Sequence, residues 1–160
     1  MCQCVGVTKD FSCIITDKIP DLELIGKSQC FPLYWYKKNQ AIELNLFSSV
    51  GEDYKRHDAI TDWILHQFRD RFHAGRQIDK EMIFYYVYGL LHSEDYRARF
   101  SADLKKSLPR IPIVESLNDF LAFEQAGRRL AELHLNYENR KASDCVKVVG
   151  DKKVESTTKD

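Results

Sequence analysis

Apolar and β-branched residues cluster in short runs over the first forty positions, as they do in β-strands. Residues 2–9 (CQCVGVTK) and 11–17 (FSCIITD) are two such runs, and residues 22–38 continue the pattern up to the aromatic sequence LYWY. Residues 39–58 are polar and have no regular period, which predicts a loop. We therefore expect a small, mainly antiparallel β portion over about residues 2–38.

From residue 60 onward, apolar side chains recur every three or four positions, which predicts helices. The first helix has Thr61 as a candidate N-cap, and Gly75 suits its end. Its apolar face is expected to contain Trp63, Ile64, Phe68 and Phe72. Asp79 is placed to cap a second helix, with Glu81 in the first turn where an acidic side chain complements the helix dipole.

The second helix is predicted to be buried on almost every side, because residues 82–91 (MIFYYVYGLL) have no polar face. Its tyrosine rings would fill space while their hydroxyls find hydrogen-bond partners, and Gly89 would let another element approach closely. Ser93 then caps a third helix, in which Tyr96, Phe100, Leu104 and Leu108 repeat every four residues up to Pro109.

A last long helix is expected over residues 117–138 after a cap at Ser116. Its apolar face would contain Leu117, Phe120, Phe123, Ala126, Leu130, Leu133 and Tyr137. The predicted fold class is α+β, with a β-rich portion and polar loop over 1–58 and about four helices over 59–139. Residues 140–160 would form a short strand and a charged, disordered tail.

Composition narrows the class of protein. Apolar residues make up 44% and charged residues 30%, values typical of a soluble globular domain. Lysine plus arginine equals aspartate plus glutamate, 24 of each, which argues against a protein dominated by nonspecific phosphate binding but leaves room for a local basic face. No apolar run is long enough to cross a membrane and no signal peptide is evident, so we expect a cytoplasmic protein without a membrane partner.

The five cysteines do not suggest a disulfide framework, because their number is odd and the sequence is not secretory. The pair Cys2 and Cys4 has a spacing that zinc could use, but no second pair of ligands stands at a matching distance. Cys13 and Cys30 lie in apolar, strand-like segments. We expect buried thiols rather than a metal site.

No motif predicts catalysis by this chain or a cofactor within it. Glycine-rich phosphate loops, the nucleophile elbow GxSxG and the zinc motif HExxH are all absent from the sequence. The sequence His92-Ser93-Glu94-Asp95 contains the side chains of a possible acid/base cluster, but a helix cap accounts for Ser93 and both acids. We assign no catalytic and no metal-binding residue.

Several longer stretches are similar to a known family. They are FSCIITDKIPDLELIGKSQCFPLYWY, ITDWILHQFRDRF, IFYYVYGLLHSEDYRARFSADLKKSLPRIPIV and AGRRLAELHLNYE. In this order, over residues 2–138, they resemble the C-terminal specificity region of Type ISP restriction–modification enzymes. These bacterial enzymes join a nuclease, a helicase-like translocase, an adenine methyltransferase and a target recognition domain in one polypeptide.

The resemblance implies a DNA target recognition domain without chemistry of its own. Its partners would be double-stranded DNA, bound weakly by the isolated domain, and the methyltransferase and helicase regions of the parent polypeptide. Base-reading side chains would lie in loops, over residues 37–58 and around 109–116. Candidates by side-chain chemistry are Asn39, Gln40 and Asn45 for adenine and Arg56 or Arg110 for guanine.

Basic side chains in and near these loops and on the third helix are the candidates for phosphate contacts, although a solvated helix face is the more common role of such residues. The complete set of DNA-binding candidates is Lys37, Lys38, Asn39, Gln40, Arg56, Arg97, Arg99, Lys105, Lys106 and Arg110.

The chain also departs from the family pattern, because the methyltransferase and motor regions are not in it and the family region normally continues beyond LHLNYE. Two other interpretations therefore stay open. The first is a helical protein–protein interaction module that uses the aromatic face of residues 84–88 or 117–137. The second, weaker one is a small hydrolase that uses His92 or Ser93.

Overall fold

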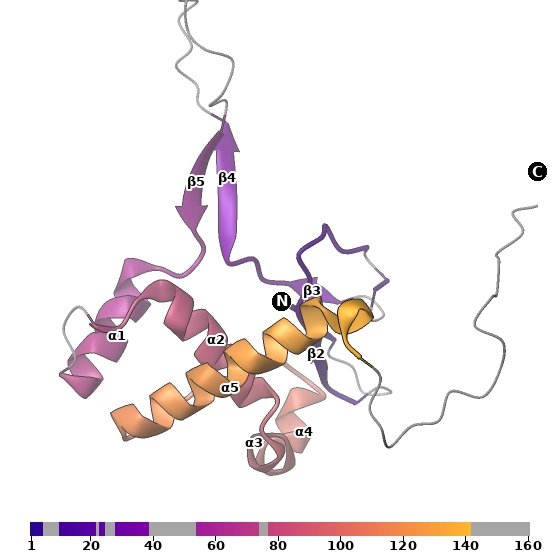
Figure 1. Ribbon diagram of the computed structural model, residues 1–160. Helices are drawn as coiled ribbons and strands as arrows, with labels where there is room; N and C mark the ends of the chain where they lie inside the picture. Colours follow the sequence, from indigo (N-terminus) through magenta and orange to yellow (C-terminus); the bar gives the residue numbers. More distant parts are fainter. Residues whose placement is uncertain (5–9, 22, 25–27, 39–53, 74–76, 142–160) are drawn as a thin grey trace, which may run out of the picture.

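The fold combines two small antiparallel β elements with a body of helices (Figure 1). The computed structural model describes residues 1–4, 10–21, 23–24, 28–38, 54–73 and 77–141. The predicted α+β class is confirmed. The predicted strand after residue 140 lies outside the described residues.

The β portion consists of a three-stranded sheet and a separate hairpin. In the sheet, β1 (Cys2–Cys4) lies between β2 (Ser12–Ile14) and β3 (Gln29–Cys30), and both pairs are antiparallel. In the hairpin, β4 (Tyr34–Lys38) pairs with β5 (Tyr54–Asp58), also antiparallel.

The predicted loop over residues 39–58 is therefore wrong at its end, where YKRHD forms β5. The sequence of β5 has no alternation of apolar and polar residues because neither face of this strand is buried: its burial pattern is exposed throughout except for a half-buried His57. A strand of this kind is recognised only through its partner. Residues 39–53 lie outside the described part of the chain.

Helix α1 (Asp62–Phe72) begins as predicted. The Thr61 side-chain oxygen accepts a hydrogen bond from the Ile64 N–H at 3.4 Å. The helix ends at His73, which takes the left-handed conformation with φ 49° and donates its N–H to carbonyls of the last turn. The expected end at Gly75 lies outside the described residues, and the left-handed cap belongs to His73.

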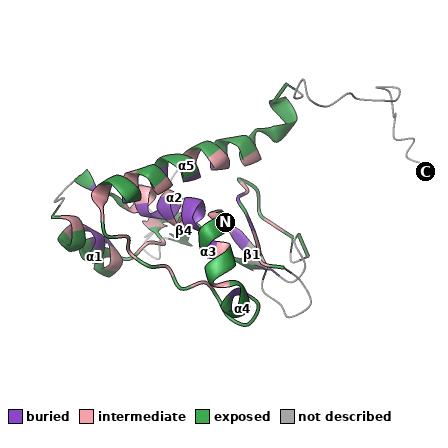
Figure 2. Ribbon diagram, turned by 90° about the horizontal axis from the view of Figure 1, so that it is seen from below, coloured by how far each residue is buried: buried purple, intermediate pink, exposed green. Residues whose placement is uncertain are grey.

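Helices α2 (Lys80–Leu91) and α5 (Leu117–Leu135) cross in direct contact and form the centre of the molecule. Figure 2 shows α2 as the most buried helix, with α5 along it. The predicted close approach at Gly89 is confirmed, because a methyl group there would overlap the Phe123 carbonyl, and one at Gly127 would overlap the Tyr85 carbonyl. The predicted cap at Asp79 is also confirmed, since its carboxylate accepts the Met82 N–H at 2.8 Å.

The buried tyrosines of α2 link it to its surroundings, as predicted. The Tyr86 hydroxyl donates to the Pro112 carbonyl at 2.6 Å. The Tyr88 hydroxyl accepts the Ile15 N–H at 3.2 Å and lies 2.5 Å from Nδ1 of His134 on α5. Burial raises the pKa of Tyr86 to about 12 and that of Tyr88 further, so both hydroxyls keep their protons at neutral pH.

The predicted single helix between Ser93 and Pro109 is two short ones. The Ser93 hydroxyl caps α3 (Glu94–Arg99), and Phe100, with φ −108° and ψ 17°, separates it from α4 (Ser101–Leu104). The turn at Phe100 places Leu104 in the core, 2% exposed, while Leu108 is left 42% exposed. The four-residue repeat thus exceeds the length of the helix.

The predicted cap of α5 at Ser116 is confirmed, but the predicted apolar face is rotated and too long. The buried residues of α5 are Phe120, Glu124, Gly127 and Ala131, whereas Ala126, Leu133 and Tyr137 are exposed. Two of these buried residues, Glu124 and Gly127, have no apolar side chain, so a hydrophobicity pattern does not identify the buried face of α5. Glu124 is buried because Arg128 pairs with it, and Gly127 is buried because α2 comes so close.

The three-stranded sheet and the helices share one core. Cys13 and Ile15, in and just after β2, belong to the same cluster of buried side chains as Phe68 of α1 and Phe120 of α5. Cys2 and Cys13 are buried thiols as expected, but Cys30 is exposed, which corrects its predicted burial. The side chains of Cys4 and Cys145 lie outside the described part. None of the helices in the described ranges is both long and apolar enough to cross a membrane.

Candidate functional site

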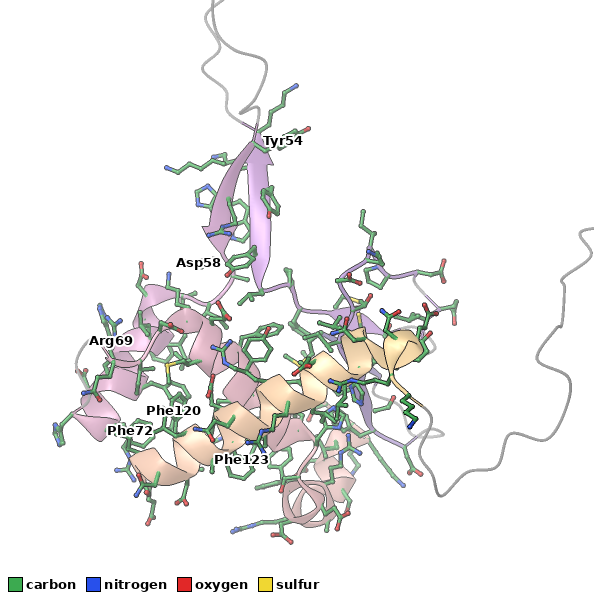
Figure 3. The ribbon with its side chains drawn as sticks, in the orientation of Figure 1. Tyr54, Asp58, Arg69, Phe72, Phe120 and Phe123 are labelled. Atoms are coloured by element: carbon green, nitrogen blue, oxygen red, sulfur yellow. The ribbon has the colours of Figure 1, made fainter. Side chains whose placement is uncertain are left out.

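The β4–β5 hairpin projects away from the helices and exposes most of its side chains. In Figure 1 it stands above the body, and in Figure 3 Tyr54 marks its far end and Asp58 its base beside α1. Trp35 is 45%, Tyr36 62% and Tyr54 60% exposed. Exposed aromatic rings on a projecting ribbon are unusual for a surface that faces only water.

The register of the hairpin sorts its side chains onto two faces. Tyr34 pairs with Asp58, Trp35 with His57, Tyr36 with Arg56, Lys37 with Lys55 and Lys38 with Tyr54. Since opposite residues share a face and successive residues alternate, one face carries Trp35, Lys37, Lys55 and His57. The other face carries Tyr34, Tyr36, Lys38, Tyr54, Arg56 and Asp58.

Each face has an internal contact that orders its side chains. On the first face, the rings of Trp35 and His57 stack with centroids 4.4 Å apart. On the second, the Arg56 guanidinium lies 4.3 Å from the centroid of the Tyr34 ring, a cation–π contact. These contacts hold the side chains of an exposed ribbon in place without burying them.

The two strands of the hairpin are basic, although the whole chain is neutral and the connecting residues 39–53 add three acids, Glu43, Glu52 and Asp53. The two strands carry four cationic side chains and one anionic side chain, Asp58. The cations are Lys37, Lys38, Lys55 and Arg56. The lysine pair Lys37 and Lys55 lies directly opposite across the strands, an arrangement that repels unless an anion is close.

Ion pairs join the base of the hairpin to the helices. The Lys80 ammonium at the start of α2 lies 3.2 Å from a carboxylate oxygen of Asp58 and 2.7 Å from one of Asp62 on α1. The hydrogen bond from Lys80 lowers the pKa of Asp62, and the same bond raises the pKa of Lys80. The hairpin is thereby oriented with respect to α1 and α2, while its acidic residue is neutralised at the end that faces the body.

A groove of about 560 Å³ lies between β4, the helices and the segment of residues 15–20 that follows β2. Its walls include Tyr34 and Tyr36 of β4, Phe84 and Tyr85 of α2 and Leu135 of α5.

The predicted DNA-binding residues fall into two separate groups. Lys37, Lys38 and Arg56 lie on the hairpin, while Asn39 and Gln40, with Asn45, lie outside the described residues. The remaining candidates lie on α3 or after α4, and both helices are at the opposite end of the molecule from the hairpin in Figure 1, while the connector that contains Arg110 leads back toward Ile60. They are Arg97, Arg99, Lys105, Lys106 and Arg110.

Within this second group, Arg97 has a structural task. Its Nε donates to the Leu91 carbonyl at 2.7 Å, and a terminal nitrogen lies 3.3 Å from Nδ1 of His92. Arg99, Lys106 and Arg110 are exposed. Lys105 is also exposed, with its ammonium 3.5 Å from an Asp10 carboxylate oxygen.

The contacts of His92 and Ser93 favour structural roles for both. The Ser93 hydroxyl accepts the Tyr96 N–H as a helix cap. The His92 ring packs edge-on against Tyr88 and His134, with centroids 4.7 and 5.6 Å away. Burial, then the charge of Arg97 and His134, lower the pKa of His92 to about 4, so it is neutral at pH 7.

The aromatic face of residues 84–88 is also a poor candidate for partner binding. Phe84, Tyr86 and Tyr88 are at most 4% exposed, and the helix packs on α5. On α5 and the short 3-10 helix Tyr137–Asn139 after it, Leu133, Leu135 and Tyr137 stay exposed.

Sequence reasoning missed five hairpin residues that share the exposed ribbon with the predicted candidates. They are Trp35, Tyr36, Tyr54, Lys55 and His57. The signal that could have found them is the similarity of YWYKK and YKRHD, two five-residue segments with aromatic and basic residues and a polar segment between them.

Comparison with known proteins agrees with this picture of the chain. Residues 1–159 match the family model of the Type ISP C-terminal specificity domain. The structure is similar to that of the ATP-dependent Type ISP restriction–modification enzyme LlaBIII bound to DNA, with a TM-score of 0.71 and 32% identity. It is also similar to the DrdV–DNA complex, with a TM-score of 0.70 and 31% identity.

The alignment covers 89% of this chain but 8% of the LlaBIII chain, and 86% of this chain but 12% of the DrdV chain. The chain thus spans about a tenth of the length of these two proteins. No protein of curated function matches the sequence. By a family match over nearly its whole length, the chain belongs to the Type ISP C-terminal specificity domains.

Proposed function

We propose that this domain selects a DNA sequence by placing the β4–β5 hairpin in the major groove of duplex DNA. The observation that carries the proposal is the pair of projecting strands β4 and β5, whose side chains are aromatic and basic. The similar structures LlaBIII and DrdV are both complexes with DNA. The chain belongs to a family of specificity domains, which supports sequence selection as the role of this contact.

The dimensions of the hairpin suit this role. A two-stranded ribbon with strands about 4.8 Å apart fits a major groove about 12 Å wide, with side chains of both faces near the groove walls. Lysines along the strands would contact phosphates and fix the register of the domain on the duplex. Arg56 has the planar, two-pronged donor geometry that recognises guanine.

In this proposal the domain contributes selection and no chemistry. Cleavage and methylation, with the cofactors that they need, would belong to other regions of a longer bacterial, cytoplasmic enzyme. The hydrogen bond that occupies the Ser93 hydroxyl and the half-buried, neutral His92 support this division. Arg99, Lys105, Lys106 and Arg110 would supply a second phosphate contact only if the duplex reached the other end of the body.

Lys37 and Lys55 provide the test. We expect Lys37→Ala combined with Lys55→Ala to weaken binding of the 160-residue chain to a mixed-sequence duplex, measured by fluorescence anisotropy between 50 and 200 mM salt. Each phosphate contact contributes about 0.9 to the slope of log K against log salt, so the slope should become shallower by up to about 1.8. Lys141→Ala is the matched control, because Lys141 is exposed and lies outside both the hairpin and the groove beside it.

Arg56 tests base selection separately from affinity. Selection of bound duplexes from a random pool should return a motif for the wild-type chain, and Arg56→Lys should relax one position of that motif by about 1–3 kcal/mol of discrimination. If the hairpin variants bind and select like the wild type while Arg99→Ala or Arg110→Ala loses binding, the DNA-binding surface lies at α3 and the proposal is wrong.

A further inference from the structure

Two cysteines of the three-stranded sheet face each other directly. The register of β1 and β3 pairs Cys2 with Cys30. The adjacent pair, Met1 and Phe31, exchanges both of its backbone hydrogen bonds, from Phe31 N to Met1 O at 2.7 Å and from Met1 N to Phe31 O at 3.1 Å. In an antiparallel ladder these pairs alternate, so Cys2 and Cys30 form a non-hydrogen-bonded pair.

This type of pair brings side chains together. Its Cα atoms lie about 4.5 Å apart, closer than in a hydrogen-bonded pair and within the range of disulfide-linked cysteines. The two sulfur atoms of Cys2 and Cys30 are in contact at 2.6 Å, and both cysteines are free. Cys13 does not share this geometry, because its partner across β1 is Gln3.

The two thiols differ in access. Cys2 is 1% exposed, and burial, then the hydrogen bond to Cys30, raise the pKa of its thiol to about 11. Cys30 is exposed and can meet a reagent in solution. A pair of this kind, with one accessible thiol and one buried thiol in contact with it, has the parts of a redox-responsive site: a sulfur that is attacked first and a second sulfur that resolves the product.

We propose that Cys2 and Cys30 form a reversible disulfide when the domain meets a small-molecule disulfide such as oxidised glutathione. The Cys30 thiolate attacks one sulfur of the reagent, a mixed disulfide forms and one reagent thiolate leaves. The Cys2 sulfur, after losing its proton to water, then attacks Sγ of Cys30 and releases the second reagent thiolate. Two protein thiols are oxidised and one reagent disulfide is reduced to two thiols.

A Cys2–Cys30 disulfide would fix the position of the segment that leads into the hairpin. Cys30 ends β3, and four residues later the chain enters β4. A Cys2–Cys30 bond would attach this point covalently to β1, the central strand of the sheet. It would also close a loop over residues 3–29, which reduces the entropy of the unfolded chain.

The experiment uses the full 160-residue chain, equilibrated in glutathione buffers of increasing oxidation and alkylated to trap remaining thiols. Digestion without reduction followed by mass spectrometry should yield a peptide that joins Cys2 to Cys30 and disappears with dithiothreitol. The oxidised chain should melt roughly 5–15 °C above the reduced chain, on loop-entropy and size scaling. Cys30→Ser should abolish both effects, and Cys13→Ala, the matched control, should keep the linked peptide.

Peptide mapping of the wild type decides the proposal even if a variant fails to fold. Cross-links of Cys30 to Cys4 or Cys145 in place of Cys2, or full alkylation of both cysteines in the most oxidising buffer, would overturn it. This readout involves no DNA, so its result is independent of the proposed function.

Discussion

Gly89 and Gly127 lie where α2 and α5 cross, and neither has room for a methyl group. Helix propensity alone says that Gly→Ala stabilises an exposed helix by up to about 1 kcal/mol. At these two positions we expect the opposite effect, a loss of stability. We expect Gly127→Ala to lower the free energy of unfolding by about 1–3 kcal/mol, because the new methyl group meets the Tyr85 backbone and cannot be moved aside cheaply. Urea unfolding measures this change in the free energy of unfolding. Gln125→Ala, on the exposed side of α5, is the control and should change that free energy by almost nothing.

His92 is another single residue with a predictable effect, because it makes the free energy of unfolding depend on pH. Its pKa is about 4 in the folded state, against about 6.5 when unfolded, because burial disfavours the charged ring. The contribution of His92 is therefore complete above pH 6.5 and is lost as the pH falls toward 4. Between pH 7.5 and 4.5, the wild type should lose about 2 kcal/mol more than His92→Gln, whose side chain stays neutral. Parallel pH profiles for the two proteins would contradict this account.

At the scale of elements, one charged contact connects the two central helices. Arg128 on α5 pairs with buried Glu124, reaches Glu81 on α2 at 2.6 Å and lies 4.5 Å from the centre of the Tyr85 ring. Removing the cation leaves a carboxylate buried without its partner. We expect Arg128→Met to cost about 2–3 kcal/mol, and the double variant with Glu124→Leu to recover most of that loss. A double-mutant cycle by urea unfolding would reject this pairing if the two costs simply add.

The helices and strands also show which features could be predicted from the sequence. Helix starts were predictable because a cap needs only its own side chain and an N–H two or three residues later, as at Thr61, Asp79, Ser93 and Ser116. The buried face of α5 and the strand β5 were not predictable from the sequence. Both depend on a partner distant in the sequence, α2 in one case and β4 in the other, and neither leaves a local apolar pattern.

The same limit applies to the candidate site. Lys37, Lys38 and Arg56 could be chosen from side-chain chemistry, but their grouping with Lys55, Trp35 and His57 follows from strand pairing. Arg97 was chosen by the same chemistry, and its guanidinium is instead bound to Leu91 and His92. Charge in a sequence is a poor guide to function until the structure shows which charges are already in use.

For the molecule as a whole, the distribution of charge sets how strongly it should hold DNA. The whole chain is neutral and the hairpin strands carry four cations and one anion, so the rest of the chain has a net charge of −3 and adds no long-range attraction. If the three lysines make the phosphate contacts and Arg56 contacts a base, the slope of log K against log salt should be no steeper than about −2.7, and affinity should fall about fortyfold between 50 and 200 mM salt. Anisotropy titrations of the 160-residue chain on one duplex measure the slope directly. A clearly steeper slope would mean that the cations near α3 also bind phosphate, which requires the duplex to contact both ends of the domain.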